Sequence, residues 1–241
     1  MMTDVHAHRG LNRQAPENTL AAFQRAYDKG IRWIETDTDI IADGTPIVLH
    51  DATTDRTTDR AGSIYDLVAA DVKTLDAGSW FSPEFAGEPV PTLHELIDFL
   101  NAHPMNLNLE LKGNQQSGEK AIALVEAALA ELERLDPSIE VIISSFAPLQ
   151  LAEIARRDST IPLALLADAR DLRANWRATV DLCGATLIHP STALATHETV
   201  DQYLAAGLGV NVWTINDPST ANKYRNWGCG VITDVADQLP A

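Results

Sequence analysis

Cysteine, positive charge and long apolar runs are all scarce in this sequence. The 241 residues include only two cysteines, Cys183 and Cys229, and they are not in a Cys-x-x-Cys spacing. We therefore expect two buried, reduced thiols rather than a disulfide framework or a zinc site. No stretch approaches the roughly 20 apolar residues of a transmembrane helix, and the first residues lack the basic and then apolar layout of a signal peptide. These absences predict a cytoplasmic protein with no stable membrane insertion.

Positive charge is outnumbered nearly two to one. There are 18 Lys and Arg residues against 34 Asp and Glu residues, which gives a formal net charge of −16. Non-specific attraction to nucleic acid or to an anionic membrane surface is therefore not expected. If the substrate is an anion, local cations must hold it against the field of the whole molecule. We expect a small-molecule partner and no nucleic acid.

Strand-like and helix-like patterns alternate along nearly the whole chain. The turn Asp43-Gly44 is a hairpin signal, so we expect 46–50 to fold back antiparallel beside 33–41. Without that arm, eight strands are expected, near residues 4, 33, 106, 141, 163, 186, 209 and 231. Eight β/α units predict a closed TIM (β/α)8 barrel, with residues 1–241 as a single domain.

Several helix boundaries can be read from capping residues. Asn18 is expected to cap the first helix, Thr92 with Glu95 forms a capping box, and Asp217 precedes Pro218 at the start of the last helix. A further helix is expected over 171–180.

Residues 51–91 break the alternation. This segment is rich in Asp, Thr, Gly and Pro and has one helix-like piece, near 65–75. A segment of this length between barrel elements usually shapes a site. We therefore predict a small insertion after the second strand, of about 51–91, that acts as a lid.

Polar side chains follow several of the predicted strands, at the ends that form the active face of such a barrel. Glu35 and Asp37 are two residues apart, so they share one face of a strand, and Glu110 comes from the neighbouring strand. Three crowded carboxylates cost too much free energy unless they are protonated or bind a cation. Oxygen-only ligands suit Mg²⁺ or Ca²⁺ better than zinc, so we predict one divalent metal ion.

Two histidines and two cations accompany this acidic cluster. His8 and His50 are the candidate general acid and base, because an imidazole in general titrates near working pH. Arg9 and Lys112 indicate a substrate with anionic oxygens, for which phosphate is the commonest group. Together with a metal ion, these residues indicate cleavage of a phosphoryl ester. His189 ends the sixth strand and is a further candidate to contact the leaving group.

Each residue also has a simpler interpretation. Glu35 and Asp37 could lie on a solvated edge, Glu110 and Lys112 could form a surface salt bridge worth little, and Trp213 could be a core residue. Because these residues all occur together at the predicted strand ends, we favour the functional interpretation.

At these positions the sequence resembles the glycerophosphodiester phosphodiesterases, in their compact bacterial cytosolic form. The matching motifs follow in order: His8-Arg9-Gly10, Pro16-Glu17-Asn18-Thr19, Glu35-x-Asp37, Val48-Leu49-His50-Asp51, Glu110-x-Lys112 and Trp213-Thr214-x-Asn216. The resemblance implies that Glu35, Asp37 and Glu110 bind the metal and that His8 and His50 move protons. It also implies that Arg9 and Lys112 hold the phosphate and that Trp213 packs against the glycerol part.

The implied reaction is metal-dependent hydrolysis of glycerophosphodiesters to sn-glycerol 3-phosphate and an alcohol. Two alternatives use the same barrel: a lysophospholipase D or phospholipase-type phosphodiesterase, and a non-catalytic barrel that binds an anion. The pair of histidines argues against the second. A monomer and a homodimer are both compatible with the sequence.

Overall fold

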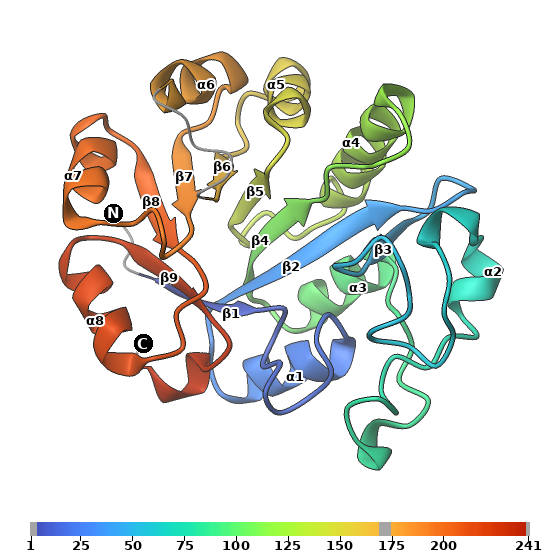
Figure 1. Cartoon of the computed structure of the whole chain (residues 1–241). Coiled ribbons are helices and arrows are strands. Elements are labelled where there is room, and N and C mark those ends of the chain that lie inside the picture. Colours follow the sequence, from blue (N-terminus) through green and yellow to red (C-terminus); the bar gives the residue numbers. More distant parts are fainter. Residues whose placement is uncertain (1–3, 169–174, 240–241) are drawn as a thin grey trace.

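The computed structural model describes residues 4–168 and 175–239. Its centre is a closed barrel of parallel strands, in which β1 pairs with β9 on one side and with β2 on the other (Figure 1). The barrel strands are β1 (Val5–His8), β2 (Trp33–Ile40), β4 (Asn106–Leu111), β5 (Val141–Ser145), β6 (Leu163–Ala167), β7 (Leu187–Pro190), β8 (Gly209–Val212) and β9 (Gly230–Thr233). The predicted TIM barrel is confirmed.

Helices surround this barrel, and a continuous apolar core fills the space between the two layers (Figure 1). They are α1 (Leu20–Asp28), α3 (Leu93–Ala102), α4 (Gly118–Leu132), α5 (Pro148–Arg157), α6 (Trp176–Cys183), α7 (His197–Ala205) and α8 (Pro218–Asn226). None of the helices in the described part of the chain is long and apolar enough to cross a membrane. Cys183 and Cys229 are buried free thiols, as predicted.

Capping chemistry fixes several of these helix starts. The Thr92 side chain accepts a hydrogen bond from the backbone N–H of Glu95, and the Glu95 carboxylate accepts one from the N–H of Thr92 at 2.8 Å. The Asp217 side chain likewise accepts from the N–H of Thr220 at the start of α8. These bonds satisfy backbone donors that have no partner within the helix.

The insertion follows β2 and begins with a hairpin. β3 (Pro46–Val48) runs antiparallel to β2, with Thr38 opposite Val48, as the turn Asp43-Gly44 predicts. Beyond β3 lie two 3₁₀ turns, η1 (Ile64–Asp66) and η2 (Pro83–Phe85), and the short helix α2 (Ala69–Val72). This region has a small apolar cluster apart from the main core and projects from one side of the barrel (Figure 1).

Three local predictions differ from the structure. Asn18 does not cap α1, because Thr19 is the N-cap and Asn18 has a left-handed backbone with φ of 58°. The helix-like piece at 65–75 is two short elements, η1 and α2, since Leu67 between them is extended. The helix expected over 171–180 falls partly on residues 171–174, outside the described residues, and the described helix is α6.

Candidate active site

Three carboxylates meet at the C-terminal end of the barrel. Glu35 and Asp37 lie on β2, and Glu110 lies on β4, where it pairs in register with Asp37. Ligand atoms from all three lie within 4.8 Å of one another, and all three residues are buried. Glu35 and Asp37 converge because side chains two residues apart on a strand point to the same face, as the sequence spacing predicts.

Two cations only partly compensate this buried negative charge. Lys112 Nζ donates to Glu110 Oε1 at 2.7 Å and to Asp37 Oδ1 at 3.2 Å, and Arg9 Nε lies 3.4 Å from Asp37 Oδ2. Although burial opposes its ionisation, Asp37 has a pKa far below its usual value because Lys112 and Arg9 stabilise the anion. Asp37 is therefore the firmly ionised member of the cluster.

The other two carboxylates are less well compensated. Burial, with the charges of Asp37 and Glu110, raises the pKa of Glu35 well above its usual value. Burial and the Asp37 charge raise the pKa of Glu110 to about 7. A bound divalent cation would remove this repulsion, and three carboxylates with no sulfur or nitrogen donor suit Mg²⁺ or Ca²⁺. The donor set therefore fits the predicted metal.

The first βα turn is shaped to reach this cluster. Arg9 has a left-handed backbone, with φ of 58°, and its N–H lies 3.2 Å from Glu35 Oε2. Gly10 follows with φ of 81°, and a Cβ there would lie 2.8 Å from the backbone of Ala22 in α1. Only glycine fits at that position, so the close approach of the turn to α1 is built into the sequence.

Asn18 supports the cluster from the same loop. Its Nδ2 donates to Asp37 Oδ2 at 2.9 Å, and its Oδ1 accepts from Thr36 Oγ1 at 2.8 Å. Thr36 points to the outer side of β2, away from the carboxylates, yet it fixes the amide that binds Asp37. Sequence reasoning missed this role, although Asn18 stands inside the Pro16-Glu17-Asn18-Thr19 motif.

Each candidate catalytic histidine is held by a carboxylate. His8 Nδ1 lies 2.6 Å from Asp234 Oδ1, and His50 Nδ1 lies 2.6 Å from Asp51 Oδ1. A carboxylate on Nδ1 fixes the ring orientation and leaves Nε2 available, and His8 Nε2 lies 4.0 Å from Glu35 Oε2. Asp234 was missed because it is 226 residues from His8, and only closure of the barrel brings them together.

The insertion contributes an arginine that links both sides of the site. Arg56 Nε donates to Asp51 Oδ2 at 2.6 Å, and its two terminal nitrogens donate to the Glu17 carboxylate at 2.7 and 2.8 Å. Glu17 in turn accepts from Arg9 Nη1 at 2.7 Å. Arg56 therefore connects the His50–Asp51 pair to Arg9 on the first βα turn.

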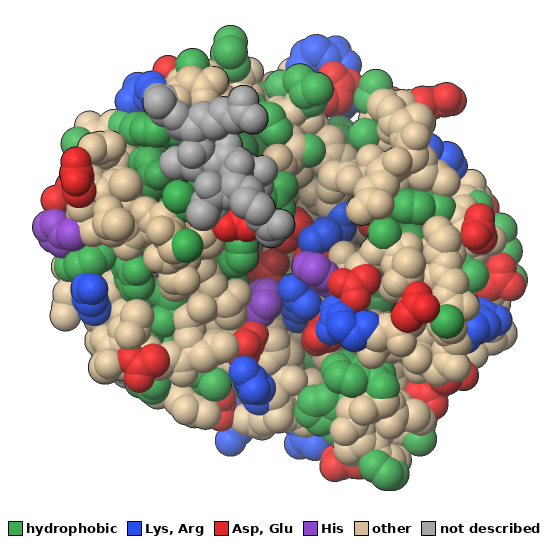
Figure 2. Space-filling view, viewed as in Figure 1, with side chains coloured by type: hydrophobic (Ala, Val, Ile, Leu, Met, Phe, Trp, Pro, Cys, Tyr) green, Lys and Arg blue, Asp and Glu red, His purple; other side chains and the backbone are tan. Residues whose placement is uncertain are grey.

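A cavity of about 430 Å³ opens beside these groups. Figure 2 looks into this face, where histidine, basic and acidic side chains gather in a hollow near its centre. One wall is apolar: Phe146 packs edge to face against Trp213 with ring centroids 5.6 Å apart. The predicted residues that line it are His8, Arg9, Glu35, His50, Glu110 and Trp213. Asp37 and Lys112 are not among the lining residues, and Lys112 Nζ donates to Asp37 Oδ1 at 3.2 Å.

His189 does not face this cavity, so its prediction as a leaving-group contact is wrong. It is fully buried inside the barrel, where its Nε2 bonds to Asn211 Nδ2 at 3.0 Å. Its backbone carbonyl accepts from Trp213 Nε1 at 2.7 Å, which orients that indole ring. Asn216 does lie near the site, where its Nδ2 donates to Asp234 Oδ2 at 2.7 Å.

Known proteins are similar to this chain in sequence and fold. Residues 8–238 match the model of the glycerophosphoryl diester phosphodiesterase family. A glycerophosphodiester phosphodiesterase of Caldanaerobacter subterraneus is 32% identical over 99% of this chain and 97% of that protein. One from Bacillus subtilis is 30% identical over 96% of this chain and 83% of that protein. The structure of an Oleispira antarctica phosphodiesterase, described as a complex with the product sn-glycerol-3-phosphate, has a TM-score of 0.91 and 32% identity, and the match covers 98% of this chain and 94% of that one.

The charge imbalance of the acidic cluster predicts a pH-dependent effect of Glu110→Gln in chelating buffer. An unfolded glutamate loses its proton near pH ~4.3, whereas folding raises the pKa of Glu110 to about 7. Wild-type protein therefore loses stability through Glu110 as the pH rises between these values, and the glutamine variant lacks this contribution. Urea unfolding should show the variant gaining on wild type by on the order of 1–3 kcal/mol from pH ~5 to ~8. Exposed Glu119→Gln is the control. If the difference in unfolding free energy between Glu110→Gln and wild type did not change with pH, the charge imbalance would be contradicted.

Proposed function

The chain belongs to the glycerophosphoryl diester phosphodiesterase family, and on that premise we propose that it hydrolyses glycerophosphodiesters to sn-glycerol 3-phosphate and a free alcohol. The observation that carries the proposal is the meeting of the Glu35, Asp37 and Glu110 carboxylates with two histidines at one cavity. The product complex described for the Oleispira antarctica relative supports the same substrate class.

We propose that Glu35, Asp37 and Glu110 hold one divalent cation, Mg²⁺ or Ca²⁺. The support is the chemistry of the donors, which are carboxylate oxygens only, and the residual negative charge of the buried cluster. When bound, the cation would act as a Lewis acid that polarises a phosphoryl oxygen and offsets the charge that builds there. Lys112 would keep the ligands in place, because its amine bonds to two of them.

His8 and His50 are the proposed general acid and base. One takes the proton from the attacking hydroxyl, which is either water or the glycerol hydroxyl next to the ester, and the other protonates the oxygen of the departing alcohol. Asp234 and Asp51 support this assignment, since each fixes the ring of its histidine through Nδ1. Both rings can then present Nε2 to the substrate.

The remaining roles concern binding of the substrate. Arg9 and Lys112 are the proposed phosphate ligands, and Trp213 is the proposed contact for the glycerol part. Arg9 and Trp213 line the cavity, and burial does not neutralise Arg9, because the Asp37 and Glu17 carboxylates hold its pKa above the usual value. The cytoplasmic location and the monomeric or dimeric state expected from the sequence remain predictions.

One observation favours a second candidate, hydrolysis of lysophospholipids. Phe146 lines the cavity, and Leu149, three residues further along the chain, is 84% exposed. Exposed apolar side chains at a cavity can bind an acyl chain. The polar insertion argues for the smaller, water-soluble diesters.

The histidine roles predict a large loss of turnover in single variants. His8→Ala and His50→Ala should each lower kcat on glycerophosphocholine by roughly 10²–10⁴-fold, since a positioned acid or base contributes that much. Thermal unfolding should change little. Exposed His94→Ala, whose ring pairs with Glu131, is the control. A variant of either candidate that kept a near wild-type rate would remove that histidine from the mechanism.

Removal of divalent metal should abolish activity. We expect a chelator to stop release of glycerol 3-phosphate and added Mg²⁺ or Ca²⁺ to restore it, because the phosphoryl charge then has a counterion again. Calorimetry gives a readout besides activity: the ion should raise the Tm of wild type by binding the folded state, and much less in Glu110→Gln. An enzyme that stayed fully active after chelation would refute the metal assignment.

Relative rates on two substrates separate the candidates. We expect wild type to cleave glycerophosphocholine faster than lysophosphatidylcholine, since charged side chains such as Arg9, Glu35 and Glu110 line the cavity and the insertion beside it is polar. Phe146→Ala should lower the lysophosphatidylcholine rate more than the glycerophosphocholine rate, because Phe146 is exposed apolar surface at the cavity. Faster cleavage of lysophosphatidylcholine by wild type would favour the second candidate instead.

A further inference from the structure

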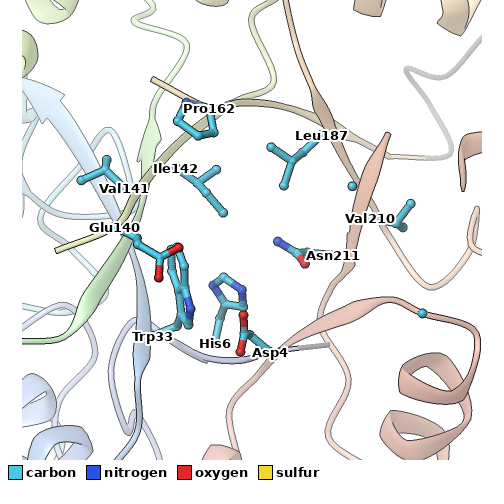
Figure 3. A pocket seen from close by; sticks show the side chains of 12 residues that line it. Asp4, His6, Trp33, Glu140, Val141, Ile142, Pro162, Leu187, Val210 and Asn211 are labelled. Carbon is cyan, nitrogen blue, oxygen red and sulfur yellow. The ribbon is translucent and has the colours of Figure 1, made fainter. Parts of the chain in front are cut away.

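A second cavity lies at the opposite, N-terminal end of the barrel. Its volume is about 440 Å³, within the range of small-molecule sites. Figure 3 shows side chains from several barrel strands pointing into it, with Ile142 and Leu187 on one side and His6 and Trp33 on the other. No role in catalysis requires this cavity, because the acidic cluster and both catalytic candidates lie at the other ends of the strands.

Three residues that line this N-terminal cavity carry buried polar atoms without hydrogen-bond partners. His6 and Trp33 are each 2% exposed, and neither His6 Nδ1 nor Trp33 Nε1 has a hydrogen-bond partner. Asp4 Oδ2 at the same cavity is also unpartnered. A buried polar group left unpaired costs about 1–3 kcal/mol, and the indole N–H can only donate. A ligand with a hydrogen-bond acceptor would satisfy it.

The ionised side chains that line this cavity are acidic. Asp4 and Glu140 precede β1 and β5 and contribute two carboxylates, whereas no Lys or Arg lines it among residues 4–168 and 175–239. Burial lowers the pKa of His6 to about 3, so that ring adds no positive charge at neutral pH. Cations are therefore favoured and anions disfavoured.

The remaining walls are apolar or aromatic. Ile142 and Leu187 supply aliphatic surface, and the Trp33 ring packs against His6 with ring centroids 4.8 Å apart. An indole ring also attracts cations that carry apolar groups, quaternary ammonium ions above all.

We propose that this N-terminal cavity binds a small organic cation with an apolar body and one hydrogen-bond acceptor, of the quaternary ammonium alcohol class. The hydroxyl oxygen accepts from Trp33 Nε1, the alkyl groups contact Ile142 and Leu187, and the charge faces Asp4 and Glu140. The site is separate from the proposed hydrolysis and does not depend on it.

Choline and neohexanol form a matched pair of probes, because carbon replaces the charged nitrogen in neohexanol. Calorimetric titration should show choline binding about tenfold more tightly. Asp4→Asn combined with Glu140→Gln should remove most of that preference and leave neohexanol binding unchanged. Equal affinities of the two probes for wild type, or a preference that survives in the double variant, would overturn the proposal.

The position of the bound probe is read from the indole N–H signals in NMR spectra. Choline should shift the Trp33 signal, which is assigned by its loss in Trp33→Phe, whereas a shift of the Trp213 signal alone would place choline in the catalytic cavity and overturn the proposal. Trp33→Phe should also weaken choline binding about fivefold, since it removes the donor. If that variant fails to fold, the Asp4 and Glu140 variant still decides, and its unchanged hydrolysis rate serves as the control for folding.

Discussion

The buried negative charge at the end of β2 is the constraint on which the site depends. Three carboxylates within 4.8 Å of one another repel strongly in a low-dielectric barrel mouth. Nearby hydrogen-bond donors stabilise part of this charge. Lys112 donates to Asp37 and Glu110, and the Asn18 amide donates to Asp37. These donors stabilise the Asp37 anion most, so the cluster keeps an excess of negative charge that protonation or a bound cation would relieve. The proposed cation site is therefore supported by how the charges are distributed as well as by the presence of three acidic residues.

Ion pairs and hydrogen bonds also join segments that are far apart in sequence at this end of the barrel. Arg56 in the insertion binds Asp51 and Glu17, and Glu17 binds Arg9 beside the cluster. On the other side, Asp234 after β9 holds His8, while Asn12 and Asn216 donate to the same carboxylate. Such networks position side chains more than they stabilise the fold, because partly exposed ion pairs contribute little free energy. The insertion thus acts on the site through Arg56, and its role as a moving lid remains a prediction.

Sequence patterns predicted what depends on local periodicity. The two-residue spacing of Glu35 and Asp37, the capping box at Thr92 and the hairpin at Asp43-Gly44 are all encoded within a few residues, and each was confirmed. Sequence patterns did not predict side-chain positions that depend on closure of the barrel or on a competing hydrogen bond. Asn18 has the chemistry of a helix cap, but Asp37 and Thr36 use its amide, and the next residue, Thr19, caps α1 instead. Asp234 gives no local sign that it serves His8. His189 ends a predicted strand, yet its side chain is fully buried, bonds to Asn211 and does not line the cavity.

Two histidines on one strand show how position, and not residue type, sets the chemistry. His6 and His8 are two residues apart on β1 and point into the same barrel. His6 is enclosed against Trp33 with no carboxylate on its Nδ1, and burial lowers its pKa to about 3, so its ring is uncharged at neutral pH. His8 reaches the mouth, where Asp234 binds Nδ1 and the ring borders a cavity. A proton-transfer role requires a carboxylate partner and access to substrate. Of the two histidines on β1, only His8 at the end of the strand has both. The interior position is left with hydrogen-bonding capacity and no charge, which suits recognition of a ligand rather than catalysis.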